Sequence, residues 1–215
     1  MLEIDPHLCK PWKYHNRDET WLNHEHCQDL IHSIQKSGQL NPALVRRLKN
    51  DPQYEYEIIY GVRRWFACSQ LNRLLLAHLT EADDKTCMVL MHTENADSKD
   101  ITEFERACSF AQQMKSGVFK TQKEMAEMMG LTQGYISKLI KAGEIFEYPW
   151  IKELFHHKRD IPIKYAYELS ILLKNQTLYP LIKNEGDQIL FEKINTGILP
   201  PNSVLKGGTR YARYF

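Results

Sequence analysis

The stretch KTQKEMAEMMGLTQGYISKLIKAG, residues 120–143, carries the most specific pattern in this 215-residue sequence. Counted from Gln122, four positions hold the residue types that two packed helices and a tight turn require: Ala126 at the fifth position, Gly130 at the ninth, Ile136 at the fifteenth and Leu139 at the eighteenth. A small side chain lets the second helix pass close to the first, a glycine permits the turn, and two apolar residues fix the second helix to the core. The stretch therefore predicts a helix-turn-helix over residues 121–142.

A helix-turn-helix places its second helix in the major groove of duplex DNA, while its first helix and backbone amides contact phosphates. Threonines stand where both helices need an N-cap, and the amide of Gln133 and the ammonium of Lys138 suit base edges or phosphate. The residues expected to contact DNA are Thr121, Gln122, Thr132, Gln133, Gly134, Tyr135, Ser137, Lys138 and Lys141. Because a specific site normally takes two such units about a dyad, we expect a homodimer on a palindromic double-stranded site. The alternative is a helical hairpin that has no ligand.

Formal charge is unevenly distributed along the chain. The whole sequence has a net charge of +1, but residues 1–114 hold 13 Lys and Arg against 17 Asp and Glu, whereas residues 115–215 hold 15 against 10. An acidic first part followed by a basic second part indicates two modules, with any polyanion held mainly by the second.

Several classes of protein are not expected. No apolar run approaches the ~18 residues of a membrane-spanning helix, and the N-terminus lacks a secretory pattern, so we expect a cytoplasmic protein. The five cysteines are widely spaced without a CxxC pair, which argues against a disulfide framework or a zinc ribbon. The sequence His-Glu-His-Cys at residues 24–27 is not expected to bind a metal, because consecutive residues on a helix point in different directions.

The part before residue 94 predicts a small mixed α/β domain. Apolar residues at Cys27, Leu30, Ile31 and Ile34 follow helical spacing, and Gly38 is a plausible cap. Strands are expected over residues 43–48, 54–60 and 86–91, and a helix from Gly61 to about Leu71. The fold class is therefore α+β, with a mixed domain over residues 1–93.

An all-helical DNA-binding domain is expected over residues 94–215. Thr102 and Thr121 each precede a glutamate by three residues, which is the form of a capping box. Later helices are expected over residues 149–155, 163–173 and 185–194. The basic and aromatic C-terminal residues 210–215 suit a nucleic-acid arm, and a packed or disordered terminus suits them equally.

A second motif follows the strand predicted to end at Tyr60. Gly61-Val62-Arg63-Arg64 leads from that strand into a helix, and a helix N-terminus presents free amides and the positive end of its dipole. Two guanidinium groups add donors suited to phosphate, so the motif predicts an anion cradle. A Gly-Arg-Arg at a solvated helix start is the equal alternative. No P-loop or Rossmann glycine motif occurs.

The order of these motifs resembles the ParB family of bacterial chromosome and plasmid partition proteins. The resemblance covers about residues 1–175 and rests on five ordered elements: the helix ending at Gly38-Gln39, the phrase Asn41-Pro42-Ala43-Leu44-Val45-Arg46, the box Gly61-Val62-Arg63-Arg64-Trp65, the pair Glu94-Asn95 opening a helical section, and the helix-turn-helix.

The resemblance implies a ParB-like N-terminal domain that binds CTP and has weak CTPase activity. In that mapping Gly61, Arg63 and Arg64, in the box that includes Val62, hold the triphosphate. Glu94 and Asn95 position Mg²⁺, and Gln39 and Arg17 lie near the nucleotide.

The resemblance also implies binding to a centromere-like, parS-like DNA site and a CTP-dependent switch to a sliding clamp. A ParA-type ATPase is the implied partner, with a nucleoid or plasmid location. Family members carry an N-terminal tail that touches ParA and a C-terminal dimerisation domain. By that standard this chain is either truncated or a minimal member.

Two residues depart from the family pattern. Val62 replaces the usual glutamate of the box, and Ser98 stands where an arginine is expected three residues after Asn95. Two alternative functions are a plasmid or mobile-element transcriptional regulator that binds DNA without a nucleotide, and a nuclease on a ParB-like fold.

Overall fold

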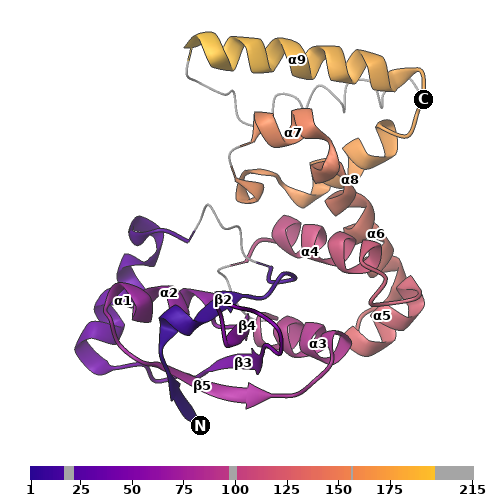
Figure 1. Ribbon diagram of the computed structural model, residues 1–215. Helices are drawn as coiled ribbons and strands as arrows, with labels where there is room; N and C mark the ends of the chain where they lie inside the picture. The colour runs from indigo at the N-terminus through magenta and orange to yellow at the C-terminus, as the bar shows by residue number, and fades with distance from the viewer. Residues whose placement is uncertain (17–21, 97–100, 156, 197–215) are drawn as a thin grey trace. The chain divides into compact units, whose positions relative to one another are not determined.

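The computed structural model describes residues 1–16, 22–96, 101–155 and 157–196 (Figure 1). The chain divides into two compact units, Met1–Ser98 and Lys99–Phe215. Among the described helices, none is long and apolar enough to cross a membrane.

The first unit is built on a five-stranded mixed sheet with the strand order β1-β5-β3-β4-β2. The strands are β1 (Leu2–Ile4), β2 (Cys9–Pro11), β3 (Ala43–Arg47), β4 (Tyr56–Tyr60) and β5 (Leu75–Thr80). The hairpin partners β3 and β4 are antiparallel, while β3 runs parallel to β5 and β4 parallel to β2. The first and fifth strands pair antiparallel at the other edge. A short 3₁₀ turn, Pro6–Leu8, joins β1 to β2.

Three helices complete this unit: α1 (His24–Ser37), α2 (Val62–Gln70) and α3 (Asp84–Glu94). The first two pack together and share one apolar cluster with the sheet, to which each contributes three buried residues. Ile58 of β4 belongs to this cluster, and its neighbour Ile59, which points to the other face, is also fully buried. The third helix contacts the same strand, so both faces of β4 are covered.

The predicted strand over residues 86–91 is wrong, because these residues lie within α3. Asp83 caps this helix by accepting a hydrogen bond from the Thr86 amide at 2.8 Å, and Cys87, Met88 and Met91 form its buried stripe. A short apolar run is compatible with either period, and the N-cap is what favours the helix here. Glu94 and Asn95 consequently end a helix instead of opening a helical section.

Three strands of the sheet, β1, β2 and β5, were not predicted from the sequence. The other two predicted strands are confirmed with shorter bounds, since β3 ends at Arg47 and β4 begins at Tyr56. The predicted helix after Gly61 is confirmed as α2.

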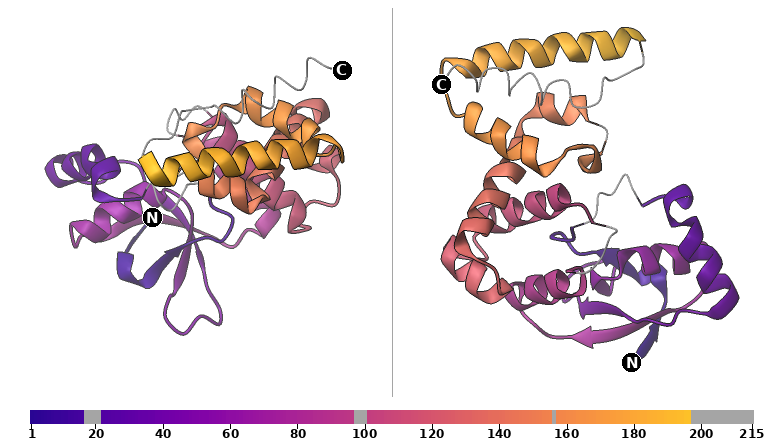
Figure 2. Two further views of the ribbon diagram at one scale, coloured as in Figure 1. Left: turned by 90° about the horizontal axis from the view of Figure 1, so that it is seen from above. Right: turned by 180° about the vertical axis from the view of Figure 1, so that it is seen from behind.

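The second unit is helical throughout its described residues (Figure 2). Its helices are α4 (Glu103–Lys115), α5 (Gln122–Met129), α6 (Gln133–Glu144), α7 (Pro149–Leu154), α8 (Ile163–Leu172) and α9 (Leu178–Thr196), with 3₁₀ turns at Ile145–Glu147 and Lys158–Asp160. The last helix begins seven residues before the predicted start at 185, because Pro180 lies in its first turn, where a proline costs no hydrogen bond. The C-terminal residues 210–215 lie outside the described part.

The packing of this unit centres on α6, which lies against α4, α5 and α8. The closest approach is at Gly143, where an added Cβ would lie 2.2 Å from the Ala107 carbonyl oxygen and 2.7 Å from the Cys108 nitrogen. Both are backbone atoms, so they cannot move aside as the end of a long side chain could. A glycine at position 143 therefore sets how closely α6 packs on α4.

We expect Gly143→Ala to lower the free energy of unfolding by about 2 kcal/mol or more, because the added methyl group forces α4 and α6 apart. Chemical denaturation measures this change. Gly134→Ala is the matched control on the same helix, because its Cβ would meet nothing within 4 Å. The control should leave stability unchanged or slightly higher, since alanine is the better helix former. Equal losses in both variants would contradict the assignment of Gly143 as the contact point.

Candidate functional site

The turn from β4 into α2 is shaped by Gly61. Its backbone is left-handed, with φ of +91°, and an added Cβ would lie 2.9 Å from the Cβ of Ala43 on β3. The first internal helix bond runs from the Trp65 amide to the Gly61 carbonyl at 3.0 Å, and no side chain caps the helix. The amides of Val62, Arg63 and Arg64 therefore stand at an uncapped helix start, a typical place for an anion.

The guanidinium of Arg64 lies beside Gly61 and has a partner at each terminal nitrogen. Its Nη1 donates to the Pro42 carbonyl oxygen at 2.6 Å, and its Nη2 pairs with the carboxylate of Glu94 at the end of α3. Burial, followed by the Glu94 charge, raises the pKa of Tyr60, whereas Arg64 lowers it. Glu94, Arg64 and the Tyr60 hydroxyl thus form one polar group beside Gly61.

Arg63 points elsewhere. Its Nη2 donates to the His26 carbonyl oxygen at 3.0 Å and to Asp29 at 2.8 Å, both on α1. The two arginines of the box, expected from the sequence to hold one triphosphate, therefore have different partners on different helices.

The side chains of Val62 and Asn95 are both buried. Val62 belongs to the apolar cluster of the first unit, so only its backbone amide faces the helix start. Asn95 caps α3, and its Nδ2 donates to the Met91 carbonyl oxygen at 2.8 Å. Of the predicted Mg²⁺ pair, Glu94 has the more accessible side chain. A single carboxylate suits Mg²⁺, which commonly takes one or two carboxylates together with substrate phosphates.

Gln39 joins the loop after α1 to the sheet. Its Nε2 donates to the Leu76 carbonyl oxygen and its Oε1 accepts from the Leu76 amide, each at 2.8 Å, and Nε2 also donates to the Asn41 carbonyl oxygen at 2.8 Å. The β3–β5 ladder begins one residue later, where Ala43 pairs with Ala77. The side chain of Gln39 thus supplies the preceding rung of that ladder.

We expect Gln39→Ala to lower the free energy of unfolding by about 1–3 kcal/mol, because both backbone groups of Leu76 lose their partner. Thermal and chemical denaturation measure the effect. Gln28→Ala, at an exposed position of α1, is the control and should be near neutral. If Gln39→Ala loses no stability, the structural role of Gln39 in the sheet is contradicted, and only its predicted role near the nucleotide remains.

Arg17 and Ser98 lie outside the described residues. The place of Arg17 near the nucleotide therefore stays a prediction, as does the loss of a phosphate ligand at Ser98.

In the second unit, α5 and α6 are joined by a turn at Gly130, whose φ is +67°. Thr121 and Thr132 cap the two helices by accepting from the amides of Glu124 at 3.0 Å and Tyr135 at 3.3 Å. Ala126, Ile136 and Leu139 are buried, as their predicted roles require. The residues predicted to face DNA follow one side of α6: Gln133, Gly134 and Lys138 are exposed, and Ser137 and Lys141 are half-buried.

Two of these residues contact neighbouring helices. The Tyr135 hydroxyl donates to Glu103 at the start of α4 at 2.9 Å, and burial together with this bond raises the pKa of Tyr135. The Lys138 ammonium lies over the Tyr167 ring of α8, 5.5 Å from its centroid. Tyr135 is therefore partly engaged within the protein, while Lys138 is steered by an aromatic ring.

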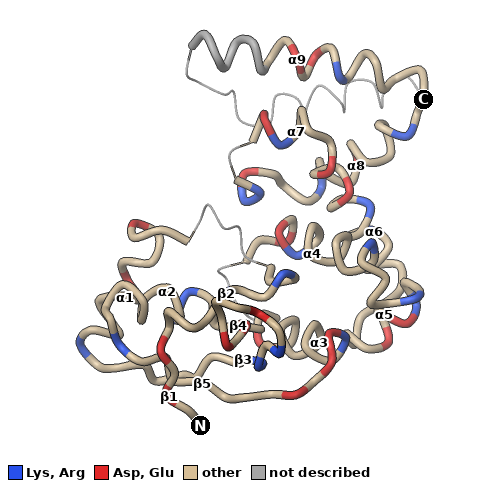
Figure 3. Tube along the Cα trace, viewed as in Figure 1, with Lys and Arg blue, Asp and Glu red and all other residues tan. Residues whose placement is uncertain are grey.

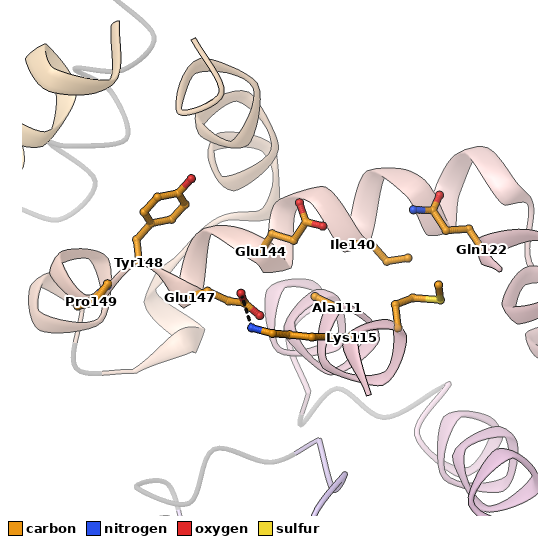
Figure 4. Close-up of a pocket in the computed structure, with 9 residues that line it drawn as sticks. Ala111, Lys115, Gln122, Ile140, Glu144, Glu147, Tyr148 and Pro149 are labelled. Atoms are coloured by element: carbon orange, nitrogen blue, oxygen red, sulfur yellow. Dashed lines mark hydrogen bonds and ion pairs between the residues drawn. The ribbon is translucent and has the colours of Figure 1, made fainter. Parts of the chain in front are cut away.

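A groove of about 650 Å³ lies beside the other end of α6 (Figure 4). Gln122 lines it together with Ile140, and Lys115 reaches Glu147 across it at 2.7 Å. The second acid of the groove, Glu144, pairs with Lys174 at 3.4 Å. Gln122 thus lines a groove whose charges are already balanced by neighbours.

Charges of both signs are interspersed along the described chain (Figure 3). The two candidate sites therefore differ from the rest of the described surface by their specific contacts and not by a large patch of charge of one sign.

Comparison with known families identifies the first unit. Residues 1–96 match the family model described as the ParB N-terminal domain. Almost the whole of the first unit is therefore similar to a ParB N-terminal domain. This similarity agrees with the resemblance inferred from the five ordered motifs.

The ParB likeness extends into the second unit. A probable chromosome-partitioning protein ParB from Vibrio cholerae is 27% identical over 137 residues, and one from Xylella fastidiosa is 31% identical over 138 residues. Each match covers 63% of this chain but only 45% and 42% of the relative. The chain thus spans less than half the length of these ParB proteins.

Solved structures share the fold. The C-terminally truncated ParB of Caulobacter crescentus, complexed to the centromeric parS site, matches over 100% of both chains with a TM-score of 0.51 at 19% identity. A Pnob8-like ParB-N domain matches 85% of this chain and 83% of its own, with a TM-score of 0.51 at 14% identity. At these identities the likeness establishes the mixed α/β and helical architecture.

Sequence reasoning missed the internal partners of the two candidate sites. The Pro42 carbonyl, Asp29, Glu103 and Tyr167 each lie more than twenty residues from the side chain they contact. No local spacing could have indicated them, because only the packing of separate elements brings them together.

Proposed function

We propose that this protein is a ParB-like, centromere-binding partition protein that binds a specific DNA site and uses CTP to switch to a sliding clamp. The observation that carries the proposal is the start of α2, which no side chain caps, where Gly61 brings the backbone close to Ala43 and the guanidinium of Arg64 lies beside Gly61. A helix start of this kind, with an adjacent guanidinium, fits the phosphates of a nucleotide.

At this site the amides of residues 62–64 would donate to phosphate oxygens, and Arg64 would add charge-assisted hydrogen bonds. Glu94 would bind Mg²⁺, which neutralises phosphate charge when bound. The buried side chain of Val62 leaves its backbone free for this role, so the replacement of the family's glutamate does not obstruct phosphate binding.

DNA would be read by the exposed side of α6. Gln133 lies in the first turn, where an amide reaches base edges, and Lys138 lies one turn further on. The related Caulobacter crescentus protein is complexed to its centromeric parS site, which supports double-stranded DNA as the partner. By the same resemblance we propose homodimerisation, a ParA-type ATPase partner, weak CTPase activity and association with the nucleoid or a plasmid.

We expect CTP with Mg²⁺ to raise the melting temperature of the wild-type protein, because a ligand that binds only the folded state stabilises it. Arg64→Ala should abolish this rise and leave binding of the DNA site intact. Arg47→Ala is the control. The guanidinium of Arg47, on β3, stacks on the Tyr56 ring, so this variant should keep the rise in melting temperature with CTP. The absence of any shift at millimolar CTP in the wild type would overturn the nucleotide part of the proposal.

We expect Gln133→Ala to weaken binding of the specific site by about 1–3 kcal/mol and relax its sequence preference. Lys138→Ala should weaken binding to all sequences and reduce the salt slope by about one. Lys183→Ala on α9, whose ammonium pairs with Asp187, is the control. The sequence of the specific DNA site is determined by sequencing the fragments of host or plasmid DNA that the protein retains with and without CTP. If neither variant weakens retention, α6 is not the reading helix.

A nucleotide-independent regulator is the second candidate. It is favoured by the internal pairing of both box arginines, Arg63 with Asp29 and Arg64 with Glu94. For this function the same fragments would be retained whether or not CTP is present.

A further inference from the structure

Both terminal nitrogens of the Arg64 guanidinium have partners in the structure. One end donates to the Pro42 carbonyl oxygen at 2.6 Å, and the other pairs with Glu94. The two side chains are 22% and 28% exposed, so their charges attract one another more strongly than those of a fully hydrated surface pair. The positive charge of Arg64 at the start of α2 is thus already paired with a carboxylate of the same unit.

This arrangement affects any phosphate that approaches the start of α2. A phosphate that reaches Arg64 must compete with Glu94 and, if Glu94 stays in place, must lie beside a like charge. A divalent cation that arrives with the phosphates changes the balance, since it is a stronger partner for the carboxylate than one guanidinium and also offsets the phosphate charge.

The backbone that carries Glu94 is firmly anchored. Asn95 closes α3 with two hydrogen bonds to the Met91 carbonyl oxygen, at 3.1 Å from its amide and 2.8 Å from its side chain. At the other end of the helix, Arg46 pairs with Asp84 at 2.6 Å and donates to the Ala82 carbonyl oxygen at 2.8 Å. An exchange of partners by Glu94 therefore requires only a side-chain rotation, without movement of α3.

We propose that Glu94 makes this site select the magnesium complex of a nucleoside triphosphate over the free triphosphate. This selection rests on the proposed nucleotide-binding function, and it gives Glu94 a second role besides holding the metal. In the absence of a cation, Glu94 stays paired with Arg64, so Arg64 does not bind a free phosphate. When a cation binds the Glu94 carboxylate, Arg64 becomes available to the phosphates. The selection acts on the phosphates, so it does not depend on the base.

A matched control exists at the other arginine of the box, Arg63. Asp29 pairs with Arg63 at 2.8 Å as Glu94 pairs with Arg64, but its side chain is 75% exposed and lies on α1. Replacing either acid by its amide removes one negative charge beside one arginine and keeps the side-chain shape. Only the Glu94 change should alter the dependence of binding on magnesium.

The experiment measures CTP affinity by calorimetry for the full chain, Glu94→Gln and Asp29→Asn, each with excess Mg²⁺ and with EDTA. We expect wild type and Asp29→Asn to lose at least about tenfold in affinity when Mg²⁺ is removed. Glu94→Gln should bind CTP in EDTA more tightly than wild type does in EDTA, and Mg²⁺ should change its affinity by less than about twofold. Inorganic tripolyphosphate should show the same order of the three proteins.

Two results would overturn the selection by Glu94 while leaving nucleotide binding intact. In the first, Glu94→Gln binds in EDTA no better than wild type, which makes Glu94 a metal ligand only. In the second, it keeps the wild-type dependence on Mg²⁺. If none of the three proteins binds CTP in either condition, the proposed nucleotide-binding function fails, and the selection fails with it. Melting temperatures without ligand verify that all three proteins are folded.

Discussion

The close approach of Gly61 to Ala43 is the constraint on which the first unit depends. Because no Cβ fits between β3 and the turn after β4, the helix α2 begins directly against the sheet. This places Arg64 within reach of the Pro42 carbonyl, just before β3, and of Glu94 at the end of α3. One backbone contact thus gathers three separate segments around an uncapped helix start.

A comparable contact organises the helical unit. Gly143 lets the backbone of α6 lie against that of α4, and Ile136 and Leu139 fill the interior on the same side of α6. With that side buried, the opposite side, from Gln133 to Lys141, faces outward. The surface that we propose for DNA therefore follows from the packing of the other side. In both units a glycine provides the close approach, and polar side chains nearby provide the chemistry.

Much of the architecture could be read from spacing alone, and the exceptions have physical causes. The caps at Thr121 and Thr132, the turn at Gly130 and the helix after Gly61 all depend on residues a few positions apart. The run from Cys87 to Met91 misled because a short apolar segment fits either a strand or a helix, and the N-cap at Asp83 that favours the helix was not taken into account. One contact of the inner strand β5 was missed because the partner of both backbone groups of Leu76 is the side chain of Gln39.

By itself the sequence determined the local elements, their order and the residue types that suit phosphate and DNA, since these depend on interactions within a few residues. Only the tertiary structure decided which charges meet. It turned Arg63 toward Asp29 and Arg64 toward Glu94, although the two arginines are adjacent in the chain. Successive residues at a helix start point in different directions, so each reaches whatever distant segment the fold has packed beside it.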